Sequence, residues 1–233
     1  MKEAIESLLP LERNLFFILN GSDSVFLDNI FWTITGKLIW VPMLIFIGVM
    51  IFHKTPIKVA IITIISIVIL FALCDQISST FFKGYFQRFR PTHHPDFMNF
   101  VDTVKEYRSR GYSFISGHAT NSFGIAILLS RIFVSRWITI PIISWATLNS
   151  YSRLYLGVHF TTDIVAGILV GSLIGLLVFE IYKATKKRVL KLEPDSTLKV
   201  TYSASKSRMI GIVLISYILF VILFSPILST LPH

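Results

Sequence analysis

The sequence predicts an all-α protein: a polytopic membrane bundle of six transmembrane helices with an amphipathic helix at its N-terminus. Three observations predict this fold class. Hydrophobic residues make up 53% of the 233 residues and charged residues only 15%. The mean hydropathy of +0.69 is well above that of soluble globular domains. Apolar segments of the ~20 residues that a helix needs to cross the hydrocarbon recur along the chain.

Residues 1–28 are predicted to form an amphipathic segment at the membrane interface. They lack the basic start, apolar middle and small-residue cleavage site of a signal peptide, so we expect them to be retained. The pattern interleaves apolar residues with charged ones: Ile5, Leu8, Leu9, Leu15, Phe16 and Leu19 with Glu3, Glu6, Glu12 and Arg13.

Residues 29–182 are predicted to form the membrane-embedded core, 183–208 a basic cytoplasmic loop and 209–233 a C-terminal transmembrane helix. The third and fourth spans are short, and Pro141 is expected to bend the fourth. The six spans are expected near residues 30–52, 57–82, 118–135, 137–157, 160–182 and 209–231.

The formal charge of +9 is divided between short membrane loops and three motifs, so anionic lipid headgroups are the expected partner and nucleic acid is not. Basic residues concentrate in the connections near 53–58, 131–136 and 183–208, which the positive-inside rule places in the cytoplasm. The opposite face then carries both termini and the long loop near 83–117. The single cysteine, Cys74, allows no intramolecular disulfide.

All three motifs are expected at helix ends on that opposite face, where one site can collect them, and the first two suit an anion. Arg90 follows Lys83 by seven residues, so a bidentate guanidinium and a mobile ammonium can reach one phosphate. Ser116, Gly117 and His118 open the third span, where free backbone N–H groups and the positive helix end favour an anion, and Gly117 permits its close approach.

The third motif supplies a histidine with a carboxylate partner. His159 and Asp163 lie four residues apart, one turn along the same helical face. Asp163 is expected to hold one imidazole nitrogen so that the other can attack phosphorus. His118 would protonate the leaving oxygen and then activate water, while Arg153 would balance charge with the other cations. This scheme uses no metal and no cofactor.

Each residue also has a structural interpretation. An isolated Lys or Arg at a helix end commonly extends toward the headgroups. His93, His94 and Asp96 resemble metal ligands but lack a fourth ligand at a recognisable spacing, which favours a solvated loop. The cluster of Lys105, Arg108 and Arg110 fits either a polar loop or a headgroup-binding surface. The joint order and spacing of the motifs favours a phosphate site over these alternatives.

The motifs resemble those of the type 2 phosphatidic acid phosphatases, which are related to the vanadium haloperoxidases. The family pattern is Lys-x6-Arg-Pro, Pro-Ser-Gly-His, and Ser-Arg-x5-His-x3-Asp. Ile115 replaces the proline of the second motif, which removes a fixed φ but no phosphate-binding group. The matching residues are Lys83, Arg90 and Pro91; Ser116, Gly117 and His118; and Ser152, Arg153, His159 and Asp163.

The resemblance implies a lipid phosphatase of a bacterial inner membrane, with its site on the periplasmic or exoplasmic side. The leading expectation is hydrolysis of a polyprenyl or glycerolipid phosphate, of the undecaprenyl diphosphate, phosphatidylglycerol phosphate or phosphatidic acid class. Alternatives are a lipid A phosphatase, a lipid phosphotransferase that uses the same phosphohistidine, a vanadate-dependent haloperoxidase, and a non-enzymatic lipid binder or transporter. The six spans argue against the haloperoxidase.

Overall fold

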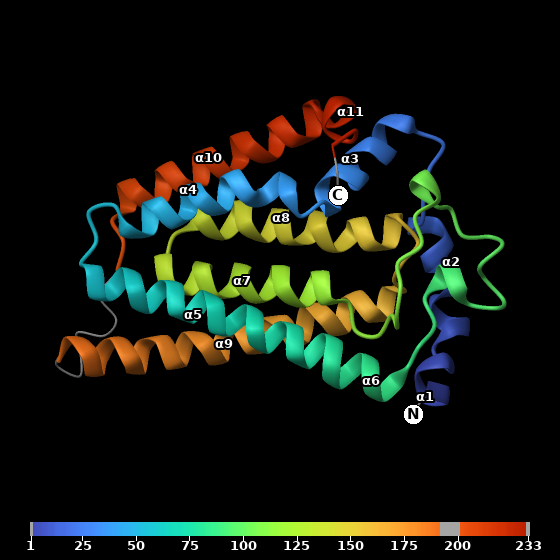
Figure 1. Ribbon diagram of the computed structural model, residues 1–233, viewed down its shortest axis with the longest axis horizontal. Coiled ribbons are helices and arrows are strands. Elements are labelled where there is room, and N and C mark those ends of the chain that lie inside the picture. The colour runs from blue at the N-terminus through green and yellow to red at the C-terminus, as the bar shows by residue number, and fades with distance from the viewer. Residues whose placement is uncertain (1, 192–200, 232–233) are drawn as a thin grey trace.

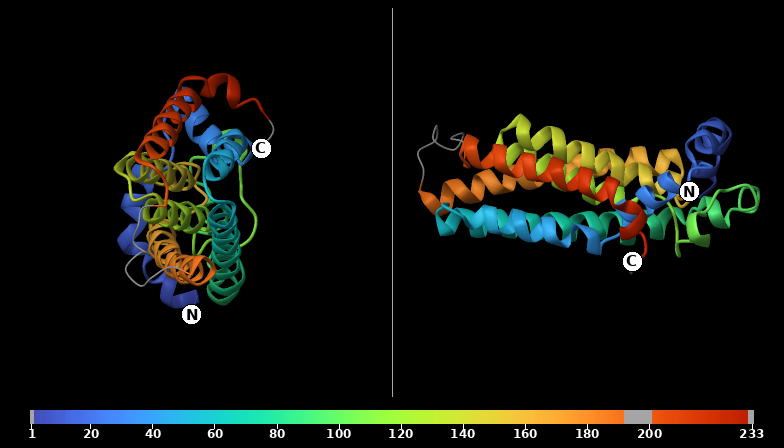
Figure 2. Two further views of the ribbon diagram at one scale, coloured as in Figure 1. Left: turned by 90° about the vertical axis from the view of Figure 1, so that its left-hand side faces the viewer. Right: turned by 90° about the horizontal axis from the view of Figure 1, so that it is seen from above.

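The computed structural model describes residues 2–191 and 201–231, and the regular elements in these ranges are all helical. The all-α prediction is therefore confirmed for the described residues. Figures 1 and 2 show the long helices lying side by side in one elongated bundle. These helices are α4 (Val41–Phe52), α5 (Ile57–Asp75), α7 (Gly117–Phe133), α8 (Arg136–Tyr155), α9 (Thr161–Leu190) and α10 (Ala204–Leu223).

The prediction of six membrane spans is confirmed only in part. By length and apolar composition, three described helical segments qualify on their own: Ile57–His93, Thr161–Leu190 and Ala204–Leu223. A fourth qualifies if α3 (Val25–Thr35) and the segment Leu38–Phe52 count as one bent span. The expected third and fourth spans correspond to α7, which has only 17 residues, and to α8, which carries Arg136, Asn149 and Arg153.

The first predicted span, residues 30–52, is broken in the structure. The two halves meet at an angle of 71° around Gly36 and Lys37. Gly36 has an extended conformation, with φ −65° and ψ 135°, which ends α3. The indole Nε1 of Trp40 donates a 2.8 Å hydrogen bond back to the carbonyl of Ile34 and so holds the bend. Lys37 is therefore presented at a corner of the chain, exposed, instead of inside a continuous helix.

The second predicted span leads directly into the long loop. Helix α5 continues through a π-helical stretch, Gln76–Phe82, into α6 (Lys83–Phe86). Gln87 ends this helix in a left-handed conformation with φ 49°. The chain then runs through a mostly irregular loop, which contains short 3₁₀ turns at Pro91–His93 and Val104–Glu106, before α7 begins.

Close packing of α7 against α9 holds the N-terminal ends of the two helices beside each other. Gly167, Gly171 and Gly175 recur every fourth residue of α9 and face the backbone of α7. A Cβ on Gly175 would lie 2.7 Å from the carbonyl oxygen of Gly124, and one on Gly171 would collide with the carbonyl of Thr120. The absence of side chains here lets the two helix backbones touch, as small residues do in membrane bundles.

The N-terminal segment crosses the end of the bundle where α7 and α9 begin (Figure 1). It consists of α1 (Lys2–Glu6) and α2 (Leu9–Leu19). Its amphipathic pattern is explained by Phe16, which is fully buried and packs 5.4 Å from the ring of Phe160. Glu12, however, also points inward and is 4% exposed.

The opposite end carries the connections that the positive-inside rule assigns to the cytoplasm. Figure 1 shows the α4–α5 and α7–α8 turns there. Of the predicted basic loop, residues 192–200 lie outside the described residues. The chain returns through α10 to the short helix α11 (Ser225–Leu228), which packs against α3.

Gly171→Ala is expected to destabilise the bundle, because its Cβ meets α7 backbone that cannot move independently of the helix. Overpacking of this kind costs about 1–3 kcal/mol. The measurement is thermal unfolding in detergent. Gly48→Ala is the matched control, since a Cβ there has nothing within 4 Å. Equal melting temperatures for the two variants would contradict the proposed role of this contact.

Candidate active site

The predicted site residues meet at the end of the bundle that α1 and α2 cover (Figure 1). Two connections build the site: the 87–116 loop between α6 and α7, and the 156–160 connection between α8 and α9. The predicted residues lie on these connections or within the helical turns beside them: Lys83, Arg90, Ser116, Gly117, His118, Arg153, His159 and Asp163.

Asp163 and His159 form the predicted pair. The Nδ1 atom of His159 lies 3.3 Å from Oδ2 of Asp163, and both side chains are buried. The same carboxylate oxygen accepts hydrogen bonds from the backbone N–H of Phe160 at 2.8 Å and from the hydroxyl of Ser113 at 2.6 Å. Because the carboxylate only accepts, we assign the imidazole proton to Nδ1. The Nε2 atom of His159 is then unprotonated.

Arg90 donates a hydrogen bond to that unprotonated nitrogen. Its NH1 atom is 3.1 Å from His159 Nε2 and donates a 2.8 Å hydrogen bond to the carbonyl of Val158. Its Nε donates to the carbonyls of Arg110 and Gly111, at 3.1 and 3.2 Å. Three carbonyl groups therefore fix the guanidinium next to the imidazole.

The start of α7 faces the same point. Ser116 caps the helix, accepting a 3.4 Å hydrogen bond from the N–H of Ala119, and donates its own N–H to the carbonyl of Asp163 at 3.0 Å. A Cβ on Gly117 would lie 3.8 Å from Nζ of Lys83, so Lys83 reaches the helix end. Free N–H groups and an ammonium together make a site for an anion.

Arg153 and His118 complete the cluster. Arg153, at the end of α8, donates from NH1 to the hydroxyl of Thr35, and its guanidinium lies 5.8 Å from the ring centroid of Tyr107. Its Nε is buried without a hydrogen-bond partner in the structure. His118 is close enough to His159 and Arg153 to interact with both electrostatically.

The electrostatics of the cluster keep His159 neutral. Burial lowers the pKa of the His159 imidazole well below its usual value of about 6.5, and the cations Arg90, Arg153 and Lys83 lower this pKa further. Asp163 lies close enough to Lys83 and Arg90 to offset part of their positive charge. The arrangement can bind a multiply charged anion beside an unprotonated imidazole nitrogen.

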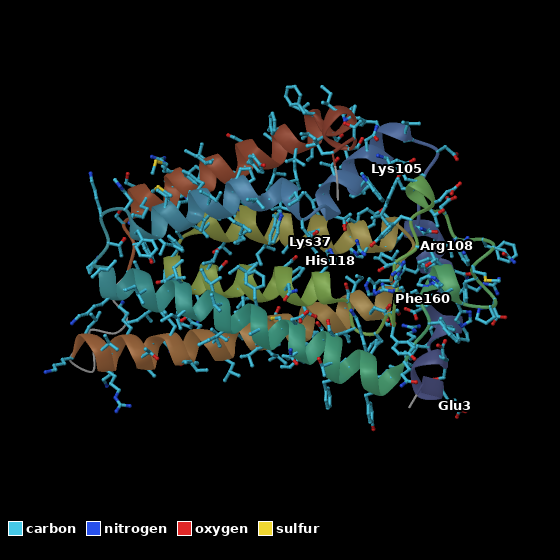
Figure 3. The ribbon with its side chains drawn as sticks, in the orientation of Figure 1. Glu3, Lys37, Lys105, Arg108, His118 and Phe160 are labelled. Atoms are coloured by element: carbon cyan, nitrogen blue, oxygen red, sulfur yellow. The ribbon has the colours of Figure 1, made fainter. Side chains whose placement is uncertain are left out.

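Four residues that the motifs did not indicate also belong to the site. Arg88 contacts Asp163, Ser113 donates to it, and Glu12 pairs with Arg88. Lys37, at the corner between α3 and α4, interacts electrostatically with His118, and Figure 3 labels the two residues close together. Arg88 lies inside the spacer of the first motif, which was its only sequence signal. Nothing in the sequence pairs Glu12 or Lys37 with these motifs.

The ambiguous residues of the long loop mostly serve contacts within the protein. His94 Nε2 lies 3.3 Å from a carboxylate oxygen of Glu6, on α1. Lys105 donates a 2.6 Å hydrogen bond to the carbonyl of Ser229, and Arg108 donates a 3.1 Å bond to that of Thr92. The described residues contain no group of three or more His, Cys, Asp or Glu arranged to hold a metal ion.

Comparison with known proteins agrees with this geometry. The PAP2 superfamily model matches residues 59–187, which include all three motifs. The chain is 41% identical to a lipid A 4'-phosphatase of Porphyromonas gingivalis, over 92% of this chain and 91% of that protein. It is 36% identical to a lipid A 4'-phosphatase of Bacteroides thetaiotaomicron, over 82% of this chain and 84% of that protein.

A solved structure shows the same architecture. The crystal structure of LpxE from Aquifex aeolicus matches with a TM-score of 0.55 and 25% identity, covering 73% of this chain and 95% of that one. The family model spans more than half of the chain, and the motifs that it covers converge at one end of a helical membrane bundle. The protein is therefore a multi-pass membrane phosphatase of the PAP2 superfamily, and its substrates are lipid phosphates.

Proposed function

We propose that the protein removes the 4'-phosphate of lipid A, or of a closely similar phosphorylated glycolipid. The observation that carries this proposal is the 41% identity over 92% of the chain to a lipid A 4'-phosphatase. The leading expectation from the sequence was a polyprenyl or glycerolipid phosphate, with lipid A as the alternative. The relatives favour the alternative.

The proposed mechanism proceeds through a phosphohistidine. The phosphate lies among Lys83, Arg90, Arg153 and the N-terminus of α7. Nε2 of His159 attacks phosphorus, forming an N–P bond as the bond to the sugar oxygen breaks, and His118 gives that oxygen its proton. His118 then removes a proton from water, which attacks the phosphohistidine and releases inorganic phosphate. The position of Arg90, 3.1 Å from Nε2, supports this assignment. A phosphate oxygen that replaces Nε2 as the acceptor for Arg90 lies beside the attacking nitrogen and leaves its lone pair available.

An apolar cavity of about 300 Å³ supports a substrate with hydrocarbon chains. It lies inside the bundle between α4, α5, α7, α8 and α10. Its wall begins at Trp40, three residues beyond Lys37, and continues along residues such as Met43, Ile47, Phe71, Ile125 and Trp145. A single lipid molecule could place its acyl chain in this cavity and its phosphate beside His118.

Cations at the rim fit a substrate with a second anionic group. Lys37, Arg108 and Arg110 are exposed at this end of the protein. Lipid A with two phosphates would present its second charge to such a rim, whereas a simple monoester has only the phosphate that reacts. The basic connections at the opposite end support a cytoplasmic position for that end, and hence a periplasmic or exoplasmic site in a bacterial inner membrane.

The proposal predicts metal-independent release of the 4'-phosphate. Purified protein in detergent with EDTA is assayed against lipid A bearing two phosphates, undecaprenyl diphosphate, phosphatidylglycerol phosphate and phosphatidic acid. Mass spectrometry identifies which lipid loses phosphate and from which position. We expect lipid A to react fastest at the 4'-position and His159→Ala to lose all activity.

Other results would assign the protein differently. Faster release from a polyprenyl or glycerolipid phosphate would reject lipid A as the substrate. A newly phosphorylated lipid without free phosphate would indicate a phosphotransferase. Halide oxidation that appears only with vanadate would indicate a haloperoxidase.

The depressed pKa of His159 predicts activity that persists in mild acid. Burial and the neighbouring cations favour the neutral imidazole, which is the nucleophilic form, so protonation that stops the reaction begins only below pH 6.5. The acid limb of kcat/KM should therefore lie below that value. The ionisation of the substrate phosphate is measured separately by phosphorus NMR, because its second pKa is near 6. An acid limb above pH 6.5 that does not follow the substrate would reject this assignment.

A further inference from the structure

A buried ion-pair network of Glu12, Arg88 and Asp163 lies behind the catalytic pair. Arg88 is 0% exposed and donates to Oδ1 of Asp163 at 2.8 Å, to the hydroxyl of Thr162 at 2.7 Å and to Oε1 of Glu12. Its guanidinium also lies 4.2 Å from the ring centroid of Phe160. The network joins α2, the loop that follows α6 and the start of α9.

Glu12 also binds the first turn of α9, in addition to Arg88. Its second oxygen, Oε2, accepts hydrogen bonds of 2.8 Å from both the N–H and the hydroxyl of Thr162, the residue before Asp163. A carboxylate is favourable at this position because the first N–H groups of a helix have no partner within it. Glu12 therefore fixes the first turn of α9, which carries Asp163.

The charges explain why two carboxylates share one arginine. Asp163 alone with Arg88 would form a neutral pair, and little negative charge would remain for His159. With Glu12 on the other side of Arg88, the three groups sum to one negative charge. That charge faces an imidazole ring that becomes positive when Nε2 is phosphorylated while Nδ1 keeps its proton.

The N-terminal segment is held against the site by further contacts. Phe16 packs on Phe160, and the guanidinium of Arg13 lies 5.7 Å from the ring centroid of Phe97, in the long loop. Glu6 contacts His94. These contacts hold the N-terminal segment in place, and with it the contact between Glu12 and Arg88.

We propose that Glu12 and Arg88 are positioning residues for the His159–Asp163 pair, which makes the N-terminal helix α2 part of the catalytic apparatus. Arg88 holds Oδ1 of Asp163 so that Oδ2 faces His159. Glu12 neutralises Arg88 so that Asp163 keeps its charge for the imidazole. This inference rests on the proposed phosphohistidine mechanism.

The test removes charge while keeping shape. Glu12→Gln leaves Asp163 alone to neutralise Arg88, so little negative charge remains for His159 and kcat should fall about tenfold. KM should stay within about twofold, because the phosphate and lipid contacts are untouched. Glu3→Gln, an exposed acid on the same segment (Figure 3), is the matched control and should behave as the wild type. Both are measured on the full-length protein in detergent.

The pH profile separates this role from a structural one. The charged and titratable groups around His159 are Lys83, Arg88, Arg90, His118, Arg153 and Asp163, with Glu12 behind Arg88. Loss of the negative charge of Glu12 should move the acid limb of kcat/KM to lower pH. A loosened structure would lower activity without that shift.

The double variant Glu12→Gln/Arg88→Gln provides the decisive comparison. With both charges gone, Asp163 keeps its full charge for His159 but loses the Arg88 contact that holds Oδ1. The double variant should therefore be more active than Glu12→Gln and less active than the wild type. If Glu12→Gln does not fold, a double variant that keeps at least about a tenth of wild-type kcat supports the proposal.

Three results would overturn the inference: unchanged kinetics in Glu12→Gln, a lowered kcat in that variant without a shift of the acid limb, or a folded double variant that is less active than Glu12→Gln or, where Glu12→Gln does not fold, that keeps less than about a tenth of wild-type kcat. Thermal unfolding of every variant confirms that folded protein is compared. Wild type and His159→Ala are assayed first. If the wild type releases no phosphate from any lipid, the proposed function fails; if it does and the Glu12 variants are normal, only this inference fails.

Discussion

The buried carboxylate of Asp163 is the interaction on which the site end of the protein depends. Its two oxygens accept from Phe160, Ser113, His159 and Arg88, and these residues come from the long loop and the α8–α9 connection. A carboxylate without exposure to water is tolerated only when its lone pairs are satisfied in this way. The same contacts that make its burial possible therefore fix the tautomer and the orientation of His159.

The cations of the site are placed at a cost in free energy that an anion relieves. Lys83, Arg90 and Arg153 lie close enough to repel one another, and Arg153 has a buried Nε without a partner. Fixed backbone carbonyls hold Arg90 in place against this repulsion. Preorganised charge of this kind binds a phosphate without rearrangement and stabilises the charge that develops as the phosphoryl group is transferred.

Local spacing made part of this site predictable from sequence. The i,i+4 separation of His159 and Asp163 is a helical contact, so the 3.3 Å pair follows from position alone. Glu12 and Lys37 belong to the site through contacts across 76 residues or more, and no local pattern encodes such contacts. The break at Gly36 was missed for a similar reason, since the apolar run continues on both sides of it.

The two predicted spans that do not qualify by length and composition, α7 and α8, illustrate how a membrane bundle distributes polarity. Apart from Arg131, the residues of α7 are buried or half-buried, because α5, α8 and α9 surround it. A helix covered by other helices needs no apolar exterior. Helix α7 can therefore carry His118 of the site and Ser122, whose hydroxyl accepts a hydrogen bond from the side chain of Asn149. The outer helices supply the lipid-facing surface instead, with exposed side chains such as Leu169 and Leu173 on α9. Hydropathy therefore identifies the outer wall of this protein more readily than α7, the covered helix that carries His118.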